Sequence, residues 1–341
     1  IPGLRMAEPG EFTRRAFEHG RIDLTAVEGL ADLIAAETEW QRRQALRLAD
    51  GGFTRRAEGW RAALLRARAA VEADLDFSDE EDVPGSVAET AIAEAARLRE
   101  DIAAVLADEG RGERIREGFQ VAIMGPPNAG KSSLLNVLAR RDAAIVTAIP
   151  GTTRDIVEVR LDLAGAAVVL ADTAGLRNSD DIVEKEGIRR ARARADAADL
   201  VLWLTDDDAP PPWAAGEGPL VVALRTKADL HPDAPTPGIA GGAFPGSISV
   251  LTGEGIAALE TALAAAAGSA AAGEPPLITR ARHRRILEEI VRDLSEVRTD
   301  VPAEIRAEAL RRAGDGLGRL AGRIDVEDVL GAIFSSFCIG K

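Results

Sequence analysis

Residues 119–133 read Phe-Gln-Val-Ala-Ile-Met-Gly-Pro-Pro-Asn-Ala-Gly-Lys-Ser-Ser, and this stretch decides the fold. The apolar run 121–124 predicts a buried strand of a parallel sheet. Residues 125–132 follow it and match G-x-x-x-x-G-K-[ST], the phosphate-binding loop. A strand before such a loop and a helix after it form the context in which the motif binds phosphate, so the match predicts a nucleotide site.

The spacing of the loop follows from its chemistry. Gly125 and Gly130 let the backbone bend, so that its N–H groups can point at a polyphosphate. Lys131 can reach the β and γ oxygens, and the hydroxyl of Ser132 can bind Mg²⁺. A helix over 132–140 would direct the positive end of its dipole at the same phosphates.

Strand-like runs recur after residue 118, and helical stretches lie between most of them. This alternation predicts an α/β domain with a mostly parallel sheet. A short connection separates the second run from the third, so we expect these two to form an antiparallel hairpin at the sheet edge. An alanine-rich helix over 255–272 should close the domain. The strand-like runs are 121–124, 156–161, 167–170, 200–204, 220–224 and 247–250.

Helical patterns flank this block on both sides. Thr25 and Glu28 have the spacing of a capping box, which predicts one helix continuing to about Asp50. An apolar stripe from Phe53 to Leu75 predicts a second helix. Further helices are expected over 86–108, around 286–297, over 303–320 and over 326–334. The simplest architecture is therefore an α/β domain inserted into an all-α helical domain.

These patterns divide the chain into four segments. We expect a polar, turn-rich connector over 1–22, a first helical part over 23–117, the α/β domain over 118–272 and a second helical part over 273–341. The chain starts at Ile1 within what has the character of structured sequence, so we expect it to be a piece of a longer protein.

Composition excludes several classes. The chain has 341 residues, and none of its apolar runs approaches the roughly 18 residues of a membrane span. A single cysteine allows no internal disulfide and is typical of a reducing cytoplasm, and no signal peptide is apparent. That cysteine and three dispersed histidines form no zinc pattern. A net charge of −14 argues against broad nucleic-acid binding but leaves a local basic patch open.

Four more motifs follow the phosphate loop in the order that a guanine-nucleotide switch protein needs. Gly-Thr-Thr-Arg-Asp at 151–155 offers a threonine to Mg²⁺ and the γ-phosphate. Asp-Thr-Ala-Gly at 172–175 offers a carboxylate to the Mg²⁺ shell and an N–H to the γ-phosphate. Thr-Lys-Ala-Asp at 226–229 carries a carboxylate for the guanine N1 and N2 protons, and Ser-Val-Leu stands at 249–251. Together the five motifs predict an α/β P-loop GTPase domain of the Ras-like type.

Three positions depart from the usual pattern. Thr226 stands where such proteins carry Asn, and it lacks the amide that would contact the base and brace the phosphate loop. Leu251 replaces the usual Lys. Leu176 stands where many switch GTPases have the Gln that orients the attacking water, so hydrolysis must be arranged differently.

At this point the chain resembles the MnmE (TrmE) family of tRNA-modification GTPases. The resemblance covers residues from about 5 to 341. This region does not include most of that family's N-terminal folate-binding, dimerising domain. The Cys-Ile-Gly-Lys ending is its most specific feature. The stretches that carry it are 7–17, 75–77 with the acidic loop after it, 151–155 and 337–341.

The resemblance implies a K⁺-activated GTPase whose G domains form a homodimer across their nucleotide faces. It implies Mg²⁺ ligands at Ser132 and Thr153, and K⁺ ligands at Asn128, Thr147, Ile149 and Thr152. Catalytic roles fall on Glu184, Lys131, Thr153 and Gly175; without the resemblance, Glu184 would be taken as a solvated carboxylate at a helix start. The full GTP-binding set is Asn128, Ala129, Gly130, Lys131, Ser132, Ser133, Thr147, Ala148, Ile149, Pro150, Gly151, Thr152, Thr153, Asp172, Thr173, Ala174, Gly175, Thr226, Lys227, Asp229, Ser249, Val250 and Leu251.

The resemblance also implies partners. Family members act with MnmG, a partner that uses FAD and NADH, and install an aminomethyl or carboxymethylaminomethyl group at C5 of the tRNA wobble uridine. A tetrahydrofolate derivative supplies the carbon unit; Arg21 and Lys341 are the candidate folate contacts, although His19 stands where Asn is usual. Cys338 is either a catalytic thiol or a bystander in the tail, because the sequence shows no activating base beside it.

The alternative is a regulatory RNA- or ribosome-binding GTPase of the Era or Der type. Such proteins carry a KH or related RNA-binding domain after the G domain. Here the flanks are helical and show no Gly-x-x-Gly loop in a β-rich setting, which disfavours this alternative. A piece lacking the folate domain could also hydrolyse GTP without supporting tRNA modification.

Overall fold

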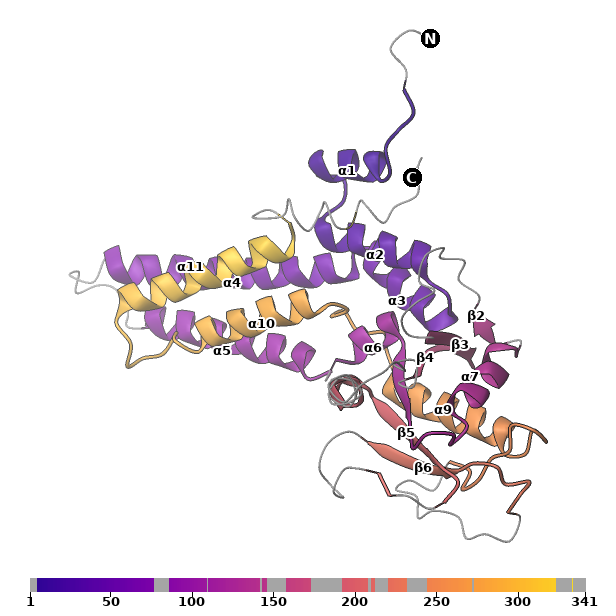
Figure 1. Ribbon diagram of the computed structural model, residues 1–341. Coiled ribbons are helices and arrows are strands. Elements are labelled where there is room, and N and C mark those ends of the chain that lie inside the picture. Colours follow the sequence, from indigo (N-terminus) through magenta and orange to yellow (C-terminus); the bar gives the residue numbers. More distant parts are fainter. Residues whose placement is uncertain are drawn as a thin grey trace, which may run out of the picture. The chain divides into compact units, whose positions relative to one another are not determined.

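In a computed structural model of the chain, two compact units are formed (Figure 1). The first contains Ile1–Ala36, Arg42–Arg116 and Glu274–Lys341, and the second contains Glu37–Gln41 and Glu117–Gly273. The elements described in the first are all helices, and the second is an α/β unit, as the sequence predicted. The structure describes residues 5–76, 86–108, 110–141, 143–145, 158–172, 192–207, 210–211, 220–231, 244–271, 273–322 and 333.

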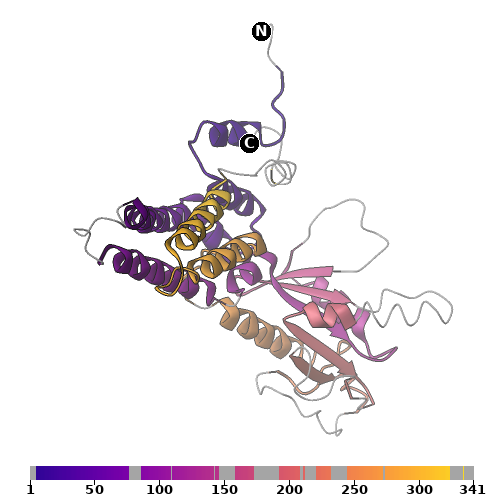
Figure 2. The same ribbon diagram turned by 90° about the vertical axis from the view of Figure 1, so that its left-hand side faces the viewer.

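Four long helices of the first unit form a bundle. In Figures 1 and 2, α4 (Gly52–Asp76), α5 (Ser86–Leu106), α10 (Ala281–Leu294) and α11 (Ala303–Leu320) lie side by side. Aliphatic side chains at helical spacing fill the space between them, so burial of one apolar stripe per helix stabilises the bundle. Leu64, Ile102, Leu287 and Leu310 belong to this core. Within the described ranges, no helix has the length and apolar character that crossing a membrane requires.

The part of the chain before the α/β unit differs from the prediction in four ways. The connector segment contains a helix, α1 (Glu11–Glu18). The single helix expected up to Asp50 is two helices, α2 (Leu24–Ala35) and α3 (Glu39–Ala49). The predicted capping box is wrong because Asp23, not Thr25, caps α2: its carboxylate accepts a hydrogen bond from the N–H of Ala26, which leaves Glu28 available for tertiary contacts. A short helix that was not predicted, α6 (Arg111–Glu117), precedes the α/β unit.

The α/β unit is built on a six-stranded sheet with the order β2-β3-β4-β1-β5-β6. The strands are β1 (Phe119–Met124), β2 (Ala144–Ile145), β3 (Glu158–Leu163), β4 (Ala166–Asp172), β5 (Leu200–Thr205) and β6 (Val221–Arg225). β1 pairs in parallel with β4 and β5, and β5 pairs in parallel with β6. The carboxyl ends of these four strands therefore lie along one edge, where ligands of parallel sheets bind.

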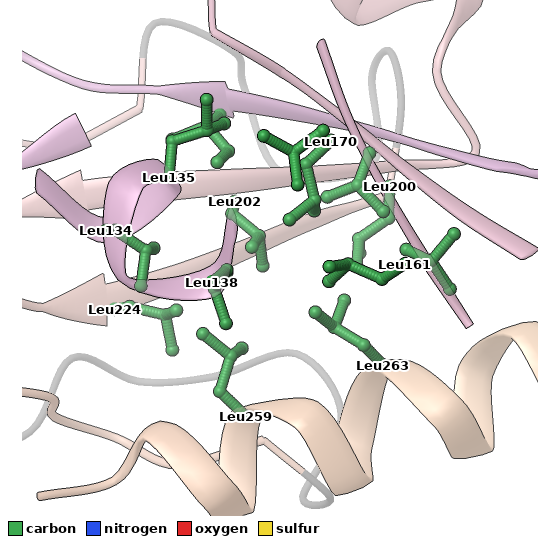
Figure 3. Close-up of a cluster of buried hydrophobic side chains, with 14 of the residues drawn as sticks. Leu134, Leu135, Leu138, Leu161, Leu170, Leu200, Leu202, Leu224, Leu259 and Leu263 are labelled. Atoms are coloured by element: carbon green, nitrogen blue, oxygen red, sulfur yellow. The ribbon is translucent and has the colours of Figure 1, made fainter. Parts of the chain in front are cut away.

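Both faces of the sheet are buried, and alternate residues face opposite sides. Val121 and Ile123 of β1 join the larger core, whereas Ala122 and Met124 pack with Ala195 and Val201 on the other face. Figure 3 shows the larger core, where leucines of the strands meet those of α7 (Lys131–Ala139) and α9 (Ile256–Ala271). Burial on both faces explains the continuous apolar runs in the sequence.

Two expectations about strands need correction. The hairpin of β3 and β4 is confirmed, but its strands extend until only Ala164 and Gly165 join them. Both residues have positive φ (56° and 86°), the backbone of a tight hairpin turn, and the short β2 forms the edge instead. The strand predicted over 247–250 is reduced to one parallel bridge between Ser247 and Arg225, because the chain turns away to form the loop before α9.

A short segment ahead of the α/β block belongs to it in space. The N–H of Trp40 donates to the carbonyl of Gly165 at 3.1 Å, and the Trp40 side chain packs against the larger core. Glu37 pairs with Arg160 of β3 at 3.3 Å. The Glu37–Gln41 segment therefore covers the turn between β3 and β4, a contact that separation in sequence concealed.

Candidate nucleotide-binding site

The phosphate-loop sequence forms a tight turn between the central strand β1 and α7. Gly125 has φ +145°, and a Cβ at this position would lie 2.1 Å from the carbonyl oxygen of Leu204 in β5. Asn128 has φ +63° and Gly130 has φ +87°, so the backbone twice enters the left-handed region. Position 125 therefore requires glycine, because the β5 backbone approaches it too closely for a side chain. The positive φ angles at 128 and 130 further restrict which residues can form this loop.

Lys131 is the first residue of α7, and its side chain is buried. Its ammonium group donates to the carbonyl oxygens of Gly125 at 2.9 Å and Pro126 at 2.7 Å. These contacts fold the lysine back over the loop. An ammonium group held there places a positive charge against the loop, which suits a polyphosphate.

The first turn of α7 offers oxygen ligands for a hard cation. Ser132 and Ser133 are exposed beside the buried Lys131. Asp172 is the last residue of β4, and its Cα pairs in register with Ile123 of β1, two positions before Gly125. Mg²⁺ takes oxygen ligands, and a serine hydroxyl at this exposed turn fits that requirement. Among the residues that the structure describes, no three His, Cys, Asp or Glu side chains form a metal-binding cluster of their own.

The predicted guanine-recognition loop over 226–229 lies against the same edge. A Cβ on Gly130 would lie 4.0 Å from the Cβ of Thr226, so this loop borders the phosphate loop. Lys227 has φ +56°, an uncommon conformation for a residue other than glycine. The hydroxyl of Ser249 donates to the Asp229 carboxylate, and the N–H of Ala228 donates to the carbonyl of Ile248 at 3.2 Å. Sequence motifs far apart in the chain thus meet at one site.

The structure shows the surroundings of two of the three residues that depart from the usual pattern. Thr226 is buried, and both its N–H (2.8 Å) and its hydroxyl (3.3 Å) donate to the carbonyl of Thr205 at the end of β5. Leu251 is 83% exposed, so it adds no polar contact at the place of the usual Lys. Val250 lies between Ser249 and Leu251 and is half-buried. Leu176 lies outside the described residues.

Sequence reasoning missed the carboxylate of Asp206, the residue after β5. It forms an ion pair with Lys227, and hydrogen bonding from that ammonium group holds the pKa of the Asp206 carboxyl below its ordinary value. The signal was present: Asp206 follows a predicted strand of a parallel sheet, and polar residues at that edge are candidates for a site.

Many predicted site residues fall outside the described part of the chain. They are Thr147, Ala148, Ile149, Pro150, Gly151, Thr152, Thr153, Thr173, Ala174, Gly175, Glu184, Cys338 and Lys341. Of the predicted folate corner, Arg21 and His19 are exposed just after α1, and Nδ1 of His19 lies 2.7 Å from the carbonyl oxygen of Arg15.

A second cluster of charged groups lies inside the helical unit. We call Glu28, Arg280, Arg282 and His283 the Glu28 cluster. The carboxylate of Glu28 is 2% exposed; its Oε2 lies 2.7 Å from Nε2 of His283, and it accepts from Arg282 at 3.1 Å. Burial alone would raise the pKa of Glu28, but His283, Arg282 and Arg280 together lower it to about 2. Arg280 also pairs with Asp32 at 2.7 Å, and Arg282 donates to the carbonyl of Arg319 at 3.2 Å, so the cluster links α2, α10 and the last turn of α11.

Comparison with known proteins adds a consistent set of relatives. The family profile described as MnmE helical domain matches residues 24–338. The tRNA modification GTPase MnmE of Methylobacterium sp. (strain 4-46) is 55% identical over 346 positions, covering 100% of this chain and 77% of that protein. That of Azorhizobium caulinodans is 52% identical over 344 positions, with the same coverage. A crystal structure of the G domain of the T. maritima FeoB iron transporter aligns at 23% identity with a TM-score of 0.29, covering 43% of this chain and 98% of that one. At that score the fold assignment rests on the strands and helices described above.

Proposed function

The chain belongs to the MnmE family of tRNA modification GTPases, and from this premise we propose that it is a K⁺-activated GTPase acting in C5 modification of the tRNA wobble uridine. Hydrolysis of GTP is the activity of the family. The observation that carries the proposal is the meeting of the phosphate loop and the guanine-recognition loop at one sheet edge, with Gly130 beside Thr226.

The chain's own residues divide the work of binding. The loop N–H groups and the buried Lys131 hold the β- and γ-phosphates, and the Asp229 carboxylate, held by Ser249, accepts the guanine N1 and N2 protons. Adenine offers no matching pair of donors at this edge. The exposed Ser132 hydroxyl, with Thr153, would hold Mg²⁺, and Asp172 would order its water shell.

Hydrolysis needs a positive charge near the phosphates and an oriented water. We assign K⁺ ligation to Asn128, Thr147, Ile149 and Thr152; when bound there, the ion would supply the positive charge that an arginine finger supplies in other GTPases. The exposed Asn128 at its left-handed turn supports this assignment. Glu184 would orient the attacking water in place of the glutamine that Leu176 replaces, with the Gly175 N–H at the γ-phosphate. Pairing of two G domains through this face would enclose both ions.

The wider role follows the family. The GTP cycle would drive conformational change in a complex with an MnmG-type partner that uses FAD and NADH, and the complex would act on tRNA. A tetrahydrofolate derivative would supply the carbon unit, with Arg21 and Lys341 as contacts from this chain. Cys338 remains a candidate thiol in the same tail. No specific observation favours the Era- or Der-type alternative.

The test is GTP turnover in K⁺ and in Na⁺ at equal ionic strength. We expect turnover at least about tenfold higher in K⁺, because fixed charge at the developing transition state lowers the barrier. Asn128→Ala should abolish the difference between the salts, and Glu184→Ala should abolish turnover in both. Asn136→Ala, on the exposed side of α7, is the matched control and should behave as wild type. Equal turnover of the wild type in the two salts would refute the K⁺ site.

A further inference from the structure

The guanine-recognition loop is held from two sides. Neither support is the side-chain amide of the asparagine that usually stands at position 226. On one side, Ala228 and Asp229 bond to the 248–249 segment. On the other side, Thr226 donates twice to the carbonyl of Thr205. The amide that an asparagine at 226 would direct toward the phosphate loop is absent, so the loop depends on the end of β5 instead.

The turn after β5 is built to receive this loop. The hydroxyl of Thr205 donates to the Asp207 carboxylate at 3.0 Å, which fixes the turn. The carbonyl of Asp206 accepts from the buried Arg225 at 3.5 Å, and the Asp206 carboxylate pairs with Lys227. Three consecutive residues, 225 to 227, thus bond to Thr205 and Asp206 at the end of β5.

Lys227 is the residue that most needs such support. Its left-handed backbone is an uncommon conformation of higher energy for a residue other than glycine. That backbone also sets the direction in which the chain continues to Asp229. A contact that fixes Lys227 therefore fixes the carboxylate that reads the guanine base.

We propose that Asp206 is a positioning residue for guanine recognition, which acts by holding Lys227 and, through it, Asp229. The proposal rests on the proposed guanine role of residues 226–229. It deepens that role because the guanine-recognition loop is then supported by the turn after β5 in place of the phosphate loop. Binding of the base then depends on a carboxylate that touches no nucleotide.

The experiment measures dissociation constants of GDP and ADP for the whole chain and its Asp206→Asn variant. We expect GDP binding to weaken about tenfold, the scale of one partly exposed hydrogen bond between charged groups. ADP binding should not change, because adenine does not use Asp229, so the preference for GDP should fall by the same factor. A loss of folding would lower both affinities together. Asp206→Glu should retain most of the preference.

Two further variants make the result decisive. If Asp206 acts through Lys227, the double variant Asp206→Asn with Lys227→Met should bind GDP no more weakly than Lys227→Met alone. Asp196→Asn removes one exposed carboxylate from the same unit and should bind GDP as wild type. Unchanged GDP affinity in Asp206→Asn, or an equal loss for GDP and ADP, would overturn the proposal. Failure of Lys131→Ala to weaken GDP binding would instead refute the nucleotide site itself.

Discussion

In the α/β unit, the buried polar side chains of Lys131, Thr226 and Ser249 lie at the start of α7 and in the segment between β6 and α9, whereas in the helical unit Glu28 and His283 lie inside the packing between α2 and α10. The first group borders a site and bonds to loop backbone or to the carboxylate of Asp229. The second group bonds to other charged side chains. In the function proposed above, the α/β unit uses buried polarity to recognise a ligand, whereas the helical unit uses it to hold α2 against α10.

This comparison predicts opposite outcomes for substitutions in the two units, and the largest effect is expected at Lys131. Lys131→Ala removes a buried positive charge from the phosphate loop, so GTP turnover should fall about a thousandfold. Unfolding of the helical unit in urea should not change. Arg141→Ala removes a cation from a surface pair with Glu260 and serves as the control. Turnover near the wild-type value in Lys131→Ala would contradict the assignment of the site.

The next effect belongs to stability and not to turnover. Glu28→Gln leaves the half-buried Arg282 and the buried His283 without their carboxylate, and it should destabilise the helical unit by about 3 kcal/mol. GTP turnover at 25 °C should persist. Glu58→Gln makes the same chemical change at an exposed position of α4 and should alter the free energy of unfolding by less than about 0.5 kcal/mol. Equal urea midpoints for the two variants would mean that the Glu28 cluster contributes no more to the free energy of unfolding than a surface ion pair does.

The same residue gives the wild type a characteristic acid dependence. The pKa of Glu28 falls from 4.5 to about 2 on folding, so the folded state binds the proton less tightly than the unfolded state does. The stabilisation is therefore complete above about pH 5 and is lost as the pH falls toward 2. The difference in unfolding free energy between the wild type and Glu28→Gln should shrink over that interval. A constant difference would show that the carboxylate is not the group that titrates.

The same contrast explains what the sequence could and could not predict. The phosphate loop, the hairpin and the α/β class follow from local spacing, because a ligand or a tight turn demands particular residues close together in the chain. Glu28 and His283 are 255 positions apart, and the residues around each of them form no local pattern that predicts their contact. The misassigned capping box has a local origin instead, since Asp23 caps α2 two residues before Thr25. Trp40 was missed because its partner Gly165 lies far along the chain, whereas Asp206 was missed although its place after a predicted strand marked it as a candidate.

The smallest effects concern apolar packing, and two glycines of α11 allow a matched test. A Cβ at Gly316 would lie 2.8 Å from Cγ1 of the buried Ile290, whereas one at Gly314 would lie 3.4 Å from Cδ2 of Leu64, an ordinary contact. Alanine favours a helix over glycine by about 1 kcal/mol. Gly314→Ala should therefore stabilise the helical unit by about 0.5–1 kcal/mol, as measured by urea unfolding.

Gly316→Ala should reverse that sign, with a net loss of about 1 kcal/mol, because overpacking against Ile290 outweighs the gain in helix propensity. The close approach of α10 and α11 at this point then depends on the absence of a side chain at Gly316. The pairing of α2 and α10 depends instead on the Glu28 cluster. Equal stabilisation by both alanines would mean that the helices can separate without cost. In that case the charged cluster, and not apolar contact, would be the feature that fixes the position of α10 within the helical unit.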